Sequence, residues 1–411
     1  MPGFDVAIIG AGPAGLMAAI AAAEAGARVA VCEQMARPGA KLLATGGGRC
    51  NLTNTASADE VMARFGRQGR FMAPALAGLD GPRLRAFFAS LGVPTHAPDG
   101  FHVFPESNSA RSVLAALVGR AEALGVRLLT GVEATALGHE GIETSRGAVP
   151  CSSVVLATGG KGYPALGATG AGYRLAAHAG HRIVPPVPGL VPLVAAERWV
   201  ARVSGVTVPE AAVWIDLPRR RHARSVGPLL FTHRGLSGPA VLDLSADVAE
   251  LLAGGSPVPL RVDLAPGTAA SAWAARFDAW RREHGRRLVR TLLADHLPAS
   301  LAAELCRVGG CGDEVRAAEI TAAQRRGLAS CLAGLPLTVT ATEGFGQAMI
   351  TRGGVALDAV NPRTLESRLR PGLFFAGEVL DLDGPCGGYN LQWAFVSGAL
   401  AGRAAAAGGP R

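Results

Sequence analysis

The sequence predicts an α/β fold in which a parallel sheet is assembled from both ends of the chain, with a β-rich domain inserted between them. Three observations predict it. A strand, glycine loop, helix and strand open the 411-residue chain, and a second strand–loop–helix unit closes it. Between them lie short β-rich runs broken by proline, glycine and arginine. With 49% hydrophobic and 18% charged residues, the composition is that of a globular protein with more than one core.

The opening unit predicts a nucleotide-binding turn. Residues 4–9, five of them apolar, predict a buried strand, residues 16–25 predict an alanine-rich helix, and residues 29–32 predict a second strand. Glu33 ends the unit, 18 residues (33 − 15) after the last of three glycines. An acid at this distance accepts hydrogen bonds from the hydroxyl groups of an adenosine ribose. The unit as a whole therefore predicts a dinucleotide site.

Each of the three glycines between strand and helix meets a separate requirement. Gly10 permits the tight turn, Gly12 lets the backbone approach a pyrophosphate, and Gly15 lets the helix lie against the strand. The helix N-terminus adds unpaired N–H groups and a partial positive charge, which favour phosphate oxygens.

The competing interpretation of this stretch is a membrane span, because residues 6–23 carry no charge. The glycines and the proline within it, and the lack of a preceding basic cluster, favour the turn instead. We therefore expect no membrane segment, no export signal and a cytoplasmic location.

Cysteine usage and charge limit the classes of partner. The seven cysteines are scattered, and we expect reduced thiols. Cys306, Cys311 and Cys331 lack a fourth ligand, so we expect no metal site. The net charge is +8, and arginines gather in residues 219–224 and 276–290. Because 38 arginines stand against two lysines, the bias indicates GC-rich codon usage, and we expect solvated basic faces and no nucleic-acid partner.

The remaining elements follow from apolar spacing. Before residue 185 the pattern predicts helices over 84–91 and 110–124, a short strand or hairpin edge over 100–105, and strands over 126–129, 134–137 and 154–157. The β-rich region then predicts a small barrel or antiparallel sheet, from runs at 190–194, 203–208, 212–217, 259–264 and 337–341. Helical spacing over 269–334 interrupts it, and a strand at 373–376 with a helix over 391–407 ends the chain.

Three segments outside the opening unit complete a site for a flavin. Ala157-Thr158-Gly159-Gly160 ends a buried strand with small residues, which lets the backbone lie against a ligand. Glu378, after Gly377, places a carboxylate where a ribityl hydroxyl is held. Residues 387–390 (GGYN) open the last helix. The N–H groups of that helix end would face the electron-rich N1/O2 edge of a reduced flavin and raise its potential.

A glycine-rich loop over 41–51 is the fourth segment. Its three glycines (46–48) let the backbone lie under a flat ring, and the donor fork of Arg49 suits a pyrophosphate. Lys41 fits a phosphate contact, a flavin-edge contact or a surface charge equally well. A disulfide-reductase mechanism would require a second cysteine next to Cys50, and the sequence has none there. We interpret Cys50 and Cys386 as small packed residues near the cofactor.

These motifs, in this order and spacing, resemble the bacterial BaiN/YhiN-type flavoproteins of the two-dinucleotide-binding-domain class. The resemblance covers nearly the whole chain and rests on residues 10–15 (GAGPAG), 45–53 (TGGGRCNLT), 230–239 (LFTHRGLSGP), 351–355 (TRGGV), 377–384 (GEVLDLDG) and 387–391 (GGYNL). It implies FAD and a split Rossmann-like FAD domain with an inserted β-barrel-like domain that carries a helical subdomain. We place the FAD domain at 1–185 and 351–411, the β-rich domain at 186–266 and 335–350, and the helical subdomain at 267–334.

The predicted function is that of an FAD-dependent oxidoreductase that passes a hydride between flavin and a small organic substrate, with NAD(P)H as a candidate reductant. The alternatives are an RNA-modifying flavoprotein and a non-catalytic flavin-binding scaffold. No catalytic residue is assigned, and the candidate proton donors are His102, Tyr163, His233 and Tyr389. We expect the cofactor to contact Gly10, Gly12, Pro13, Ala14, Gly15, Glu33, Gln34, Lys41, Leu42, Gly46, Gly47, Gly48, Arg49, Cys50, Asn51, Ala134, Ala157, Thr158, Gly159, Gly160, Gly377, Glu378, Gly387, Gly388, Asn390 and Leu391.

Overall fold

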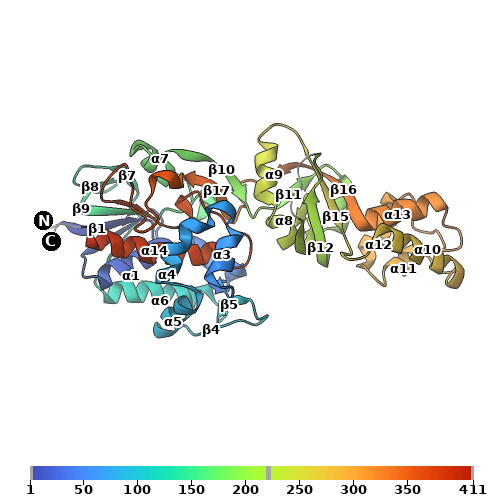
Figure 1. The fold of residues 1–411 in the computed structure, drawn as a ribbon, viewed down its shortest axis with the longest axis horizontal. Coiled ribbons are helices and arrows are strands. Elements are labelled where there is room, and N and C mark those ends of the chain that lie inside the picture. The colour runs from blue at the N-terminus through green and yellow to red at the C-terminus, as the bar shows by residue number, and fades with distance from the viewer. Residues whose placement is uncertain (1–2, 219–223, 409–411) are drawn as a thin grey trace. The chain divides into compact units, whose positions relative to one another are not determined.

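The computed structural model describes residues 3–218 and 224–408. The chain forms two compact units (Figure 1). The first contains Met1–Val187 together with Met349–Arg411, and the second contains Pro188–Ala348. Five of the six residues of the basic segment 219–224 lie outside the described residues.

The first unit is built on a parallel sheet to which both ends of the chain contribute. Its strands are β1 (Phe4–Ile9), β2 (Val29–Glu33), β6 (Arg127–Thr130), β9 (Gly147–Leu156) and β18 (Leu373–Phe375). They are ordered β6-β2-β1-β9-β18, and every neighbouring pair is parallel. This is the order of a dinucleotide-binding fold, which places loops from distant parts of the chain at one carboxyl edge.

The long strand β9 changes partners along its length. Its first half pairs antiparallel with β8 (Gly141–Thr144), which in turn pairs with β7 (Ala134–Leu137). Its second half lies between β1 and β18 in parallel register, with Val154 opposite both Ala7 and Leu373. The small antiparallel sheet therefore leads directly into the nucleotide-binding sheet.

The first and last long helices pack against each other. They are α1 (Pro13–Glu24) and α14 (Tyr389–Ala407). A β-carbon added to Gly398 would lie 2.2 Å from the carbonyl oxygen of Ala14, and one added to Gly402 would lie 2.1 Å from that of Ala18. Two glycines one turn apart therefore let the backbones approach closely.

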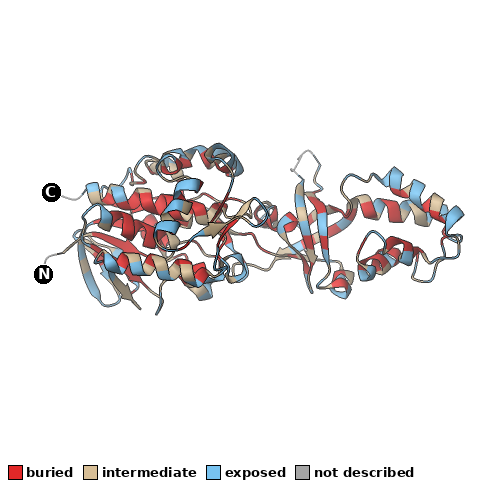
Figure 2. Ribbon diagram, turned by 90° about the horizontal axis from the view of Figure 1, so that it is seen from below, coloured by how far each residue is buried: buried red, intermediate tan, exposed pale blue. Residues whose placement is uncertain are grey.

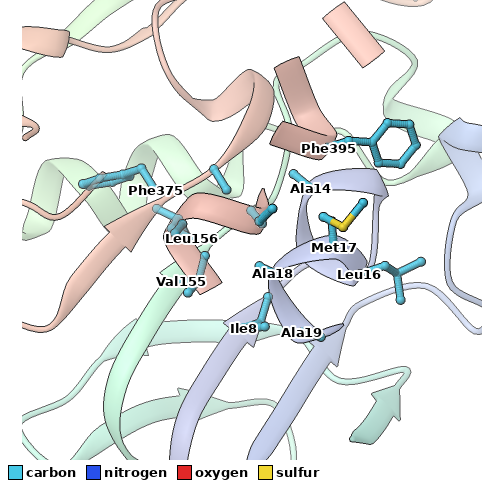
Figure 3. Packing of buried hydrophobic residues seen from close by; sticks show 14 of the residues in the cluster. Ile8, Ala14, Leu16, Met17, Ala18, Ala19, Val155, Leu156, Phe375 and Phe395 are labelled. Atoms are coloured by element: carbon cyan, nitrogen blue, oxygen red, sulfur yellow. The ribbon is translucent and has the colours of Figure 1, made fainter. Parts of the chain in front are cut away.

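The core of this unit is continuous from the sheet to these helices. Figure 3 shows Ile8 of β1, Val155 of β9, Met17 of α1 and Phe395 of α14 within it. All four are buried. The α1 helix is apolar around most of its circumference because sheet and α14 cover different sides of it.

Shorter elements surround this core. The helices are α2 (Ala40–Ala44), α3 (Ala58–Arg64), α4 (Ala73–Gly78), α5 (Gly81–Ser90), α6 (Ala110–Ala123) and α7 (Ala171–His178). A three-stranded sheet has the order β3-β5-β4, from β3 (Thr53–Asn54), β4 (Thr95–His96) and β5 (His102–Pro105). β10 (Ile183–Gly189) pairs with β17 (Ile350–Val355), where the chain leaves and re-enters the unit.

The second unit holds a closed barrel with the strand order β11-β14-β13-β12-β15-β16. Its strands are β11 (Leu193–Ala195), β12 (Thr207–Ile215), β13 (Ser225–Phe231), β14 (Gly235–Ser237), β15 (Val258–Asp263) and β16 (Leu335–Thr342). Between β15 and β16 lie α10 (Ala270–Glu283), α11 (Val289–Leu293), α12 (Ala299–Val308) and α13 (Ala322–Gly334). Barrel and helices share one hydrophobic core, and Figure 2 shows buried residues running through both.

The fold class is confirmed, but several details of the barrel region differ from prediction. The strand expected over 203–208 starts only at Thr207, because Arg198–Val203 forms a 3-10 helix. Two helices, α8 (Pro239–Leu242) and α9 (Ser245–Leu252), lie where only β structure was expected. Their apolar residues pack into the barrel core. This tertiary contact cannot be predicted from the periodicity of such short runs.

Other expectations concern cysteines, metals and membranes. All seven cysteines are free. The part of the chain that the structure describes has no cluster of three or more histidine, cysteine, aspartate or glutamate side chains arranged to hold a metal. Within 3–218 and 224–408, no helix has both the length and the apolar character that a membrane crossing requires.

Candidate functional site

The glycines of the opening turn divide into two that shape the fold and one that faces open space. Gly10 has φ +102°, and a β-carbon there would lie 2.6 Å from the carbonyl oxygen of Ala157. A β-carbon on Gly15 would lie 1.8 Å from the carbonyl oxygen of Gly10. Around Gly12, by contrast, no atom lies within 4 Å of an added β-carbon. Gly12 precedes the first turn of α1, where helix N–H groups lack helical partners, so a ligand's phosphate fits there.

Glu33 holds the turn in place. Its Oε2 accepts a hydrogen bond from the Ala11 N–H at 2.7 Å, and its Oε1 accepts one from the Met35 N–H at 2.8 Å. The residue is 8% exposed. Each carboxylate oxygen retains a lone pair, so Glu33 can still accept from a ribose hydroxyl. The sequence predicted the ribose contact and did not reveal this second task.

An ion pair joins the two ends of the chain at the carboxyl edge of the sheet. Lys41 Nζ lies 2.8 Å from Glu378 Oε2, and the two side chains are 23% and 22% exposed. Glu378 Oε1 accepts a hydrogen bond from the Thr351 N–H at 2.9 Å. The hydroxyl of Thr351 accepts hydrogen bonds from the N–H groups of Lys161 (2.7 Å) and Gly162 (3.2 Å). Thr351 was not among the predicted site residues.

Small residues are required beside this ion pair. A β-carbon on Gly160 would lie 2.4 Å from Thr351 Oγ1 and 2.6 Å from Glu378 Oε1. Gly159 has φ +70°, and a β-carbon there would have no atom within 4 Å. Gly160 thus makes room for the polar network, whereas Gly159 faces open space, as Gly12 does.

The glycine-rich loop is strongly curved. Gly46, Gly47 and Gly48 have φ of +57°, +66° and +86°, and Cys50 has φ +63°. Burial raises the pKa of the Cys50 thiol to about 12, so it stays protonated at neutral pH and is no redox thiolate. Asn51 Oδ1 is buried and has no hydrogen-bond partner in the described residues. A buried amide oxygen without a donor points to a ligand that supplies one.

Arg49 packs on an aromatic ring in this structure. Its guanidinium lies 4.6 Å from the centre of the Phe104 ring, and its Nε donates to the Gly46 carbonyl at 3.3 Å. The side chain is exposed. A pyrophosphate contact by Arg49 would therefore require its release from Phe104.

The start of α14 is anchored by its own side chains. Asn390 Oδ1 accepts a hydrogen bond from the Gly384 N–H at 2.8 Å, and its Nδ2 donates to the Gly384 carbonyl at 2.7 Å. Asn54 Nδ2 donates to the Gly387 carbonyl at 2.8 Å. A β-carbon on Gly388 (φ +83°) would lie 2.6 Å from the Thr53 carbonyl oxygen. Asn390 shapes the preceding loop, which its position in the sequence did not reveal.

The remaining predicted residues are mostly structural in this conformation. Gln34 Nε2 donates to the Gly167 carbonyl at 2.5 Å. A β-carbon on Gly377 would lie 2.8 Å from the Ala14 β-carbon, so Gly377 lets the last segment approach α1. Among the other predicted residues, the buried ones are Leu42, Ala134 and Ala157. The partly exposed ones, at helix starts or strand ends, are Pro13, Thr158 and Leu391.

The residues present fit a dinucleotide. Open glycine positions at Gly12, Gly47 and Gly159 leave backbone free to approach a ligand. The Asn51 amide oxygen lacks a donor, and Lys41 with Glu378 supplies one cation and one hydroxyl acceptor. All of these belong to the first unit.

Residues 4–404 match the model of the family described as HI0933-like protein Rossmann domain. The chain belongs to this family. The resemblance stated from the motifs is thereby confirmed, and the match runs through both units.

Characterised relatives carry two different activities in their names. The chain is 37% identical to a 3-dehydro-bile acid delta(4,6)-reductase of Clostridium scindens, across 98% of each chain. It is 33% identical to a ribosomal RNA dihydrouridine synthase of Escherichia coli, across 97% of this chain and 96% of that protein. Among solved structures, 3-ketosteroid-delta4-(5alpha)-dehydrogenase of Rhodococcus jostii is similar in fold, with a TM-score of 0.52, 19% identity, and coverage of 98% and 96%.

Proposed function

We propose that this protein is an FAD-dependent reductase of carbon–carbon double bonds conjugated to a carbonyl in a small organic molecule. When bound, FAD supplies a donor and acceptor of hydride. The observation that carries the proposal is the Lys41–Glu378 ion pair at 2.8 Å. It joins α2, near one end of the chain, to the turn after β18, near the other end, and Glu378 lies beside Gly160, whose added β-carbon would be 2.6 Å from Oε1.

Each segment of the first unit would hold one part of the cofactor. The helix start at Gly12 would bind the pyrophosphate, and Glu33 would accept from the adenosine ribose. Glu378, oriented by Thr351, would accept from a ribityl hydroxyl. The curved loop at 46–48 would lie under the ring, and the helix end after Gly388 would stabilise negative charge at the ring edge.

The substrate class is what the two named activities have in common. A delta(4,6)-reductase of a 3-dehydro bile acid, by its name, acts on double bonds in conjugation with a 3-oxo group. Dihydrouridine differs from uridine by saturation of one double bond that is conjugated to a ring carbonyl. In a double bond conjugated to a carbonyl, the carbon farther from the carbonyl is electron-poor, so it is the carbon to which a hydride adds.

The test is anaerobic. The purified protein should carry FAD, and NADH and NADPH should be mixed separately with it while flavin absorbance is followed. The protein reduced by light should then be mixed with 2-cyclohexenone or a 4-ene-3-oxo steroid. Reoxidation by an enone supports the proposal. A colourless protein that does not take up FAD, or a reduced flavin that no enone reoxidises, contradicts it. Bleaching by neither nicotinamide would remove NAD(P)H as the reductant.

Glu378→Gln tests the ion pair, with Glu140→Gln as a matched control on the exposed β7–β8 turn. Glu378→Gln should weaken FAD binding about tenfold or more, because a hydrogen bond to a charged group contributes about 1.5–3 kcal/mol. The control should bind FAD as the natural protein does. Equal affinity of the two variants would contradict the assigned contact.

The second candidate function is reduction of uridine in RNA, favoured by the Escherichia coli relative's name. Exposed arginines at the end of α10, Arg281 and Arg282, suit phosphate contacts. This function would be supported if ribosomal RNA, and not enones, reoxidised the reduced flavin. The protein's affinity for RNA should then fall steeply as the salt concentration rises. Turnover with either substrate would exclude a non-catalytic scaffold.

A further inference from the structure

A histidine lies between the two segments that the proposed function assigns to the flavin ring. His102 is in β5, directly opposite Asn54 in β3. Opposed residues of antiparallel strands project to the same face of the sheet, so His102 shares a face with Asn54, whose amide binds the Gly387 carbonyl.

The same face reaches the glycine-rich loop. Phe104, two residues after His102, projects to this face as well, and their ring centres are 6.4 Å apart. A β-carbon on Gly46 would lie 3.4 Å from the Phe104 ring. The His102 side chain is 39% exposed, so a substrate can reach it.

Asp99 fixes the state of the imidazole. Its Oδ2 lies 2.5 Å from His102 Nδ1, while its Oδ1 accepts the N–H groups of Phe101 (3.0 Å) and His102 (2.8 Å). The hydrogen bond from His102 is the largest cause that lowers the pKa of Asp99, and the two backbone hydrogen bonds lower it further. Asp99 is therefore an ionised acceptor at neutral pH. Nδ1 must carry a proton, and Nε2 is left as the atom that exchanges one.

Other charged or titratable groups also face this region. Arg49 comes from the glycine-rich loop and lies over the Phe104 ring. His96 of β4 is paired opposite Phe104. Tyr389 comes from the start of α14, and its ring lies 6.3 Å from that of Phe101. Asp99, from the turn before β5, contacts the imidazole itself, at Nδ1.

We propose that His102 is the acid that protonates the substrate, with Asp99 as its positioning residue. This rests on the proposed function. The carbon farther from the carbonyl receives a hydride with its two electrons, and the reduced flavin is oxidised. The neighbouring carbon receives the proton from Nε2. The π bond is lost, two C–H bonds form, and the neutral imidazole takes a proton from solvent.

The test compares His102→Gln with His139→Gln, an exposed histidine on the β7–β8 turn. Both variants should bind FAD and show the natural absorbance spectrum, which reports folding independently of turnover. Flavin reoxidation by an enone should slow about 100-fold in His102→Gln and stay unchanged in His139→Gln. The natural protein should lose rate as pH rises, because an acid must be protonated, and His102→Gln should lack this decline.

Asp99→Asn separates positioning from mere stability. It should slow flavin reoxidation less than His102→Gln does while FAD binding stays natural, because a neutral amide accepts the hydrogen bond from Nδ1 less strongly than a carboxylate does and so positions the imidazole less firmly. An unchanged rate and pH profile in His102→Gln would overturn the assignment of His102 while leaving the proposed function intact. A natural protein that binds no flavin or reduces no enone would instead contradict the proposed function.

Discussion

Replacing Gly398 by alanine tests whether the two ends of the chain are held together by the close approach of α1 and α14. The added β-carbon would lie 2.2 Å from the Ala14 carbonyl oxygen and 3.0 Å from its carbonyl carbon. A backbone oxygen cannot rotate away, so the helices must separate by about 1 Å to regain van der Waals distance.

The expected cost follows from two opposing terms. Overpacking costs about 1–3 kcal/mol, and the upper end applies because backbone atoms collide. Alanine is favoured over glycine inside a helix by about 1 kcal/mol. The net loss in the free energy of unfolding is therefore about 2 kcal/mol.

Gly119→Ala is the matched control. Gly119 lies inside α6, and an added β-carbon there meets no atom within 4 Å. This variant keeps the helix-propensity gain without the collision and should be more stable by about 0.5–1 kcal/mol. Hydrogen exchange of peptides from α1 and α14 in increasing urea measures the first unit alone. If Gly398→Ala is as resistant to urea as Gly119→Ala, the close approach of these helices is not what holds the unit together.

Three further predictions concern single sites. Gly12→Ala should change the free energy of unfolding by no more than about 0.5 kcal/mol but weaken FAD binding in a flavin titration. Gly15→Ala should lower the free energy of unfolding, because of these two positions only Gly15 has backbone atoms where the β-carbon would lie. Burial lowers the pKa of His181, so below about pH 6.5 the unfolded chain binds a proton that the folded chain resists. The unfolding free energy should therefore fall as pH drops through this range, and His181→Gln should flatten that fall in urea titrations. Glu304, 1% exposed, is paired with Arg202, so Glu304→Gln should destabilise the second unit by about 1–3 kcal/mol, and an unchanged urea midpoint would refute this.

The sequence predicted segments of the candidate site because the residue types in them are constrained locally. Gly10 needs a positive φ, and Gly15 needs the space that a β-carbon would fill. Such requirements restrict the residue type at single positions. The spacing between these positions then indicates that they belong to one motif. Thr351, by contrast, acts through its hydroxyl on backbone groups of residues 161 and 162, and nothing local distinguishes it from other strand threonines.

The barrel region shows where local patterns stop being informative. Short strands were predicted there from β-rich runs, yet α8 and α9 lie among them. Their helical state depends on burial against the barrel, which is a long-range contact.

The sequence by itself determined the nucleotide turn, the split of the sheet between the two chain ends, and the family, because each depends on residue type at fixed spacing. Only the tertiary structure decided which side chains meet. Lys41 and Glu378 are 337 residues apart, and Asp99 holds His102 in an orientation that spacing alone does not specify. Side-chain partners depend on strand order and helix packing, so they are determined when the whole chain folds.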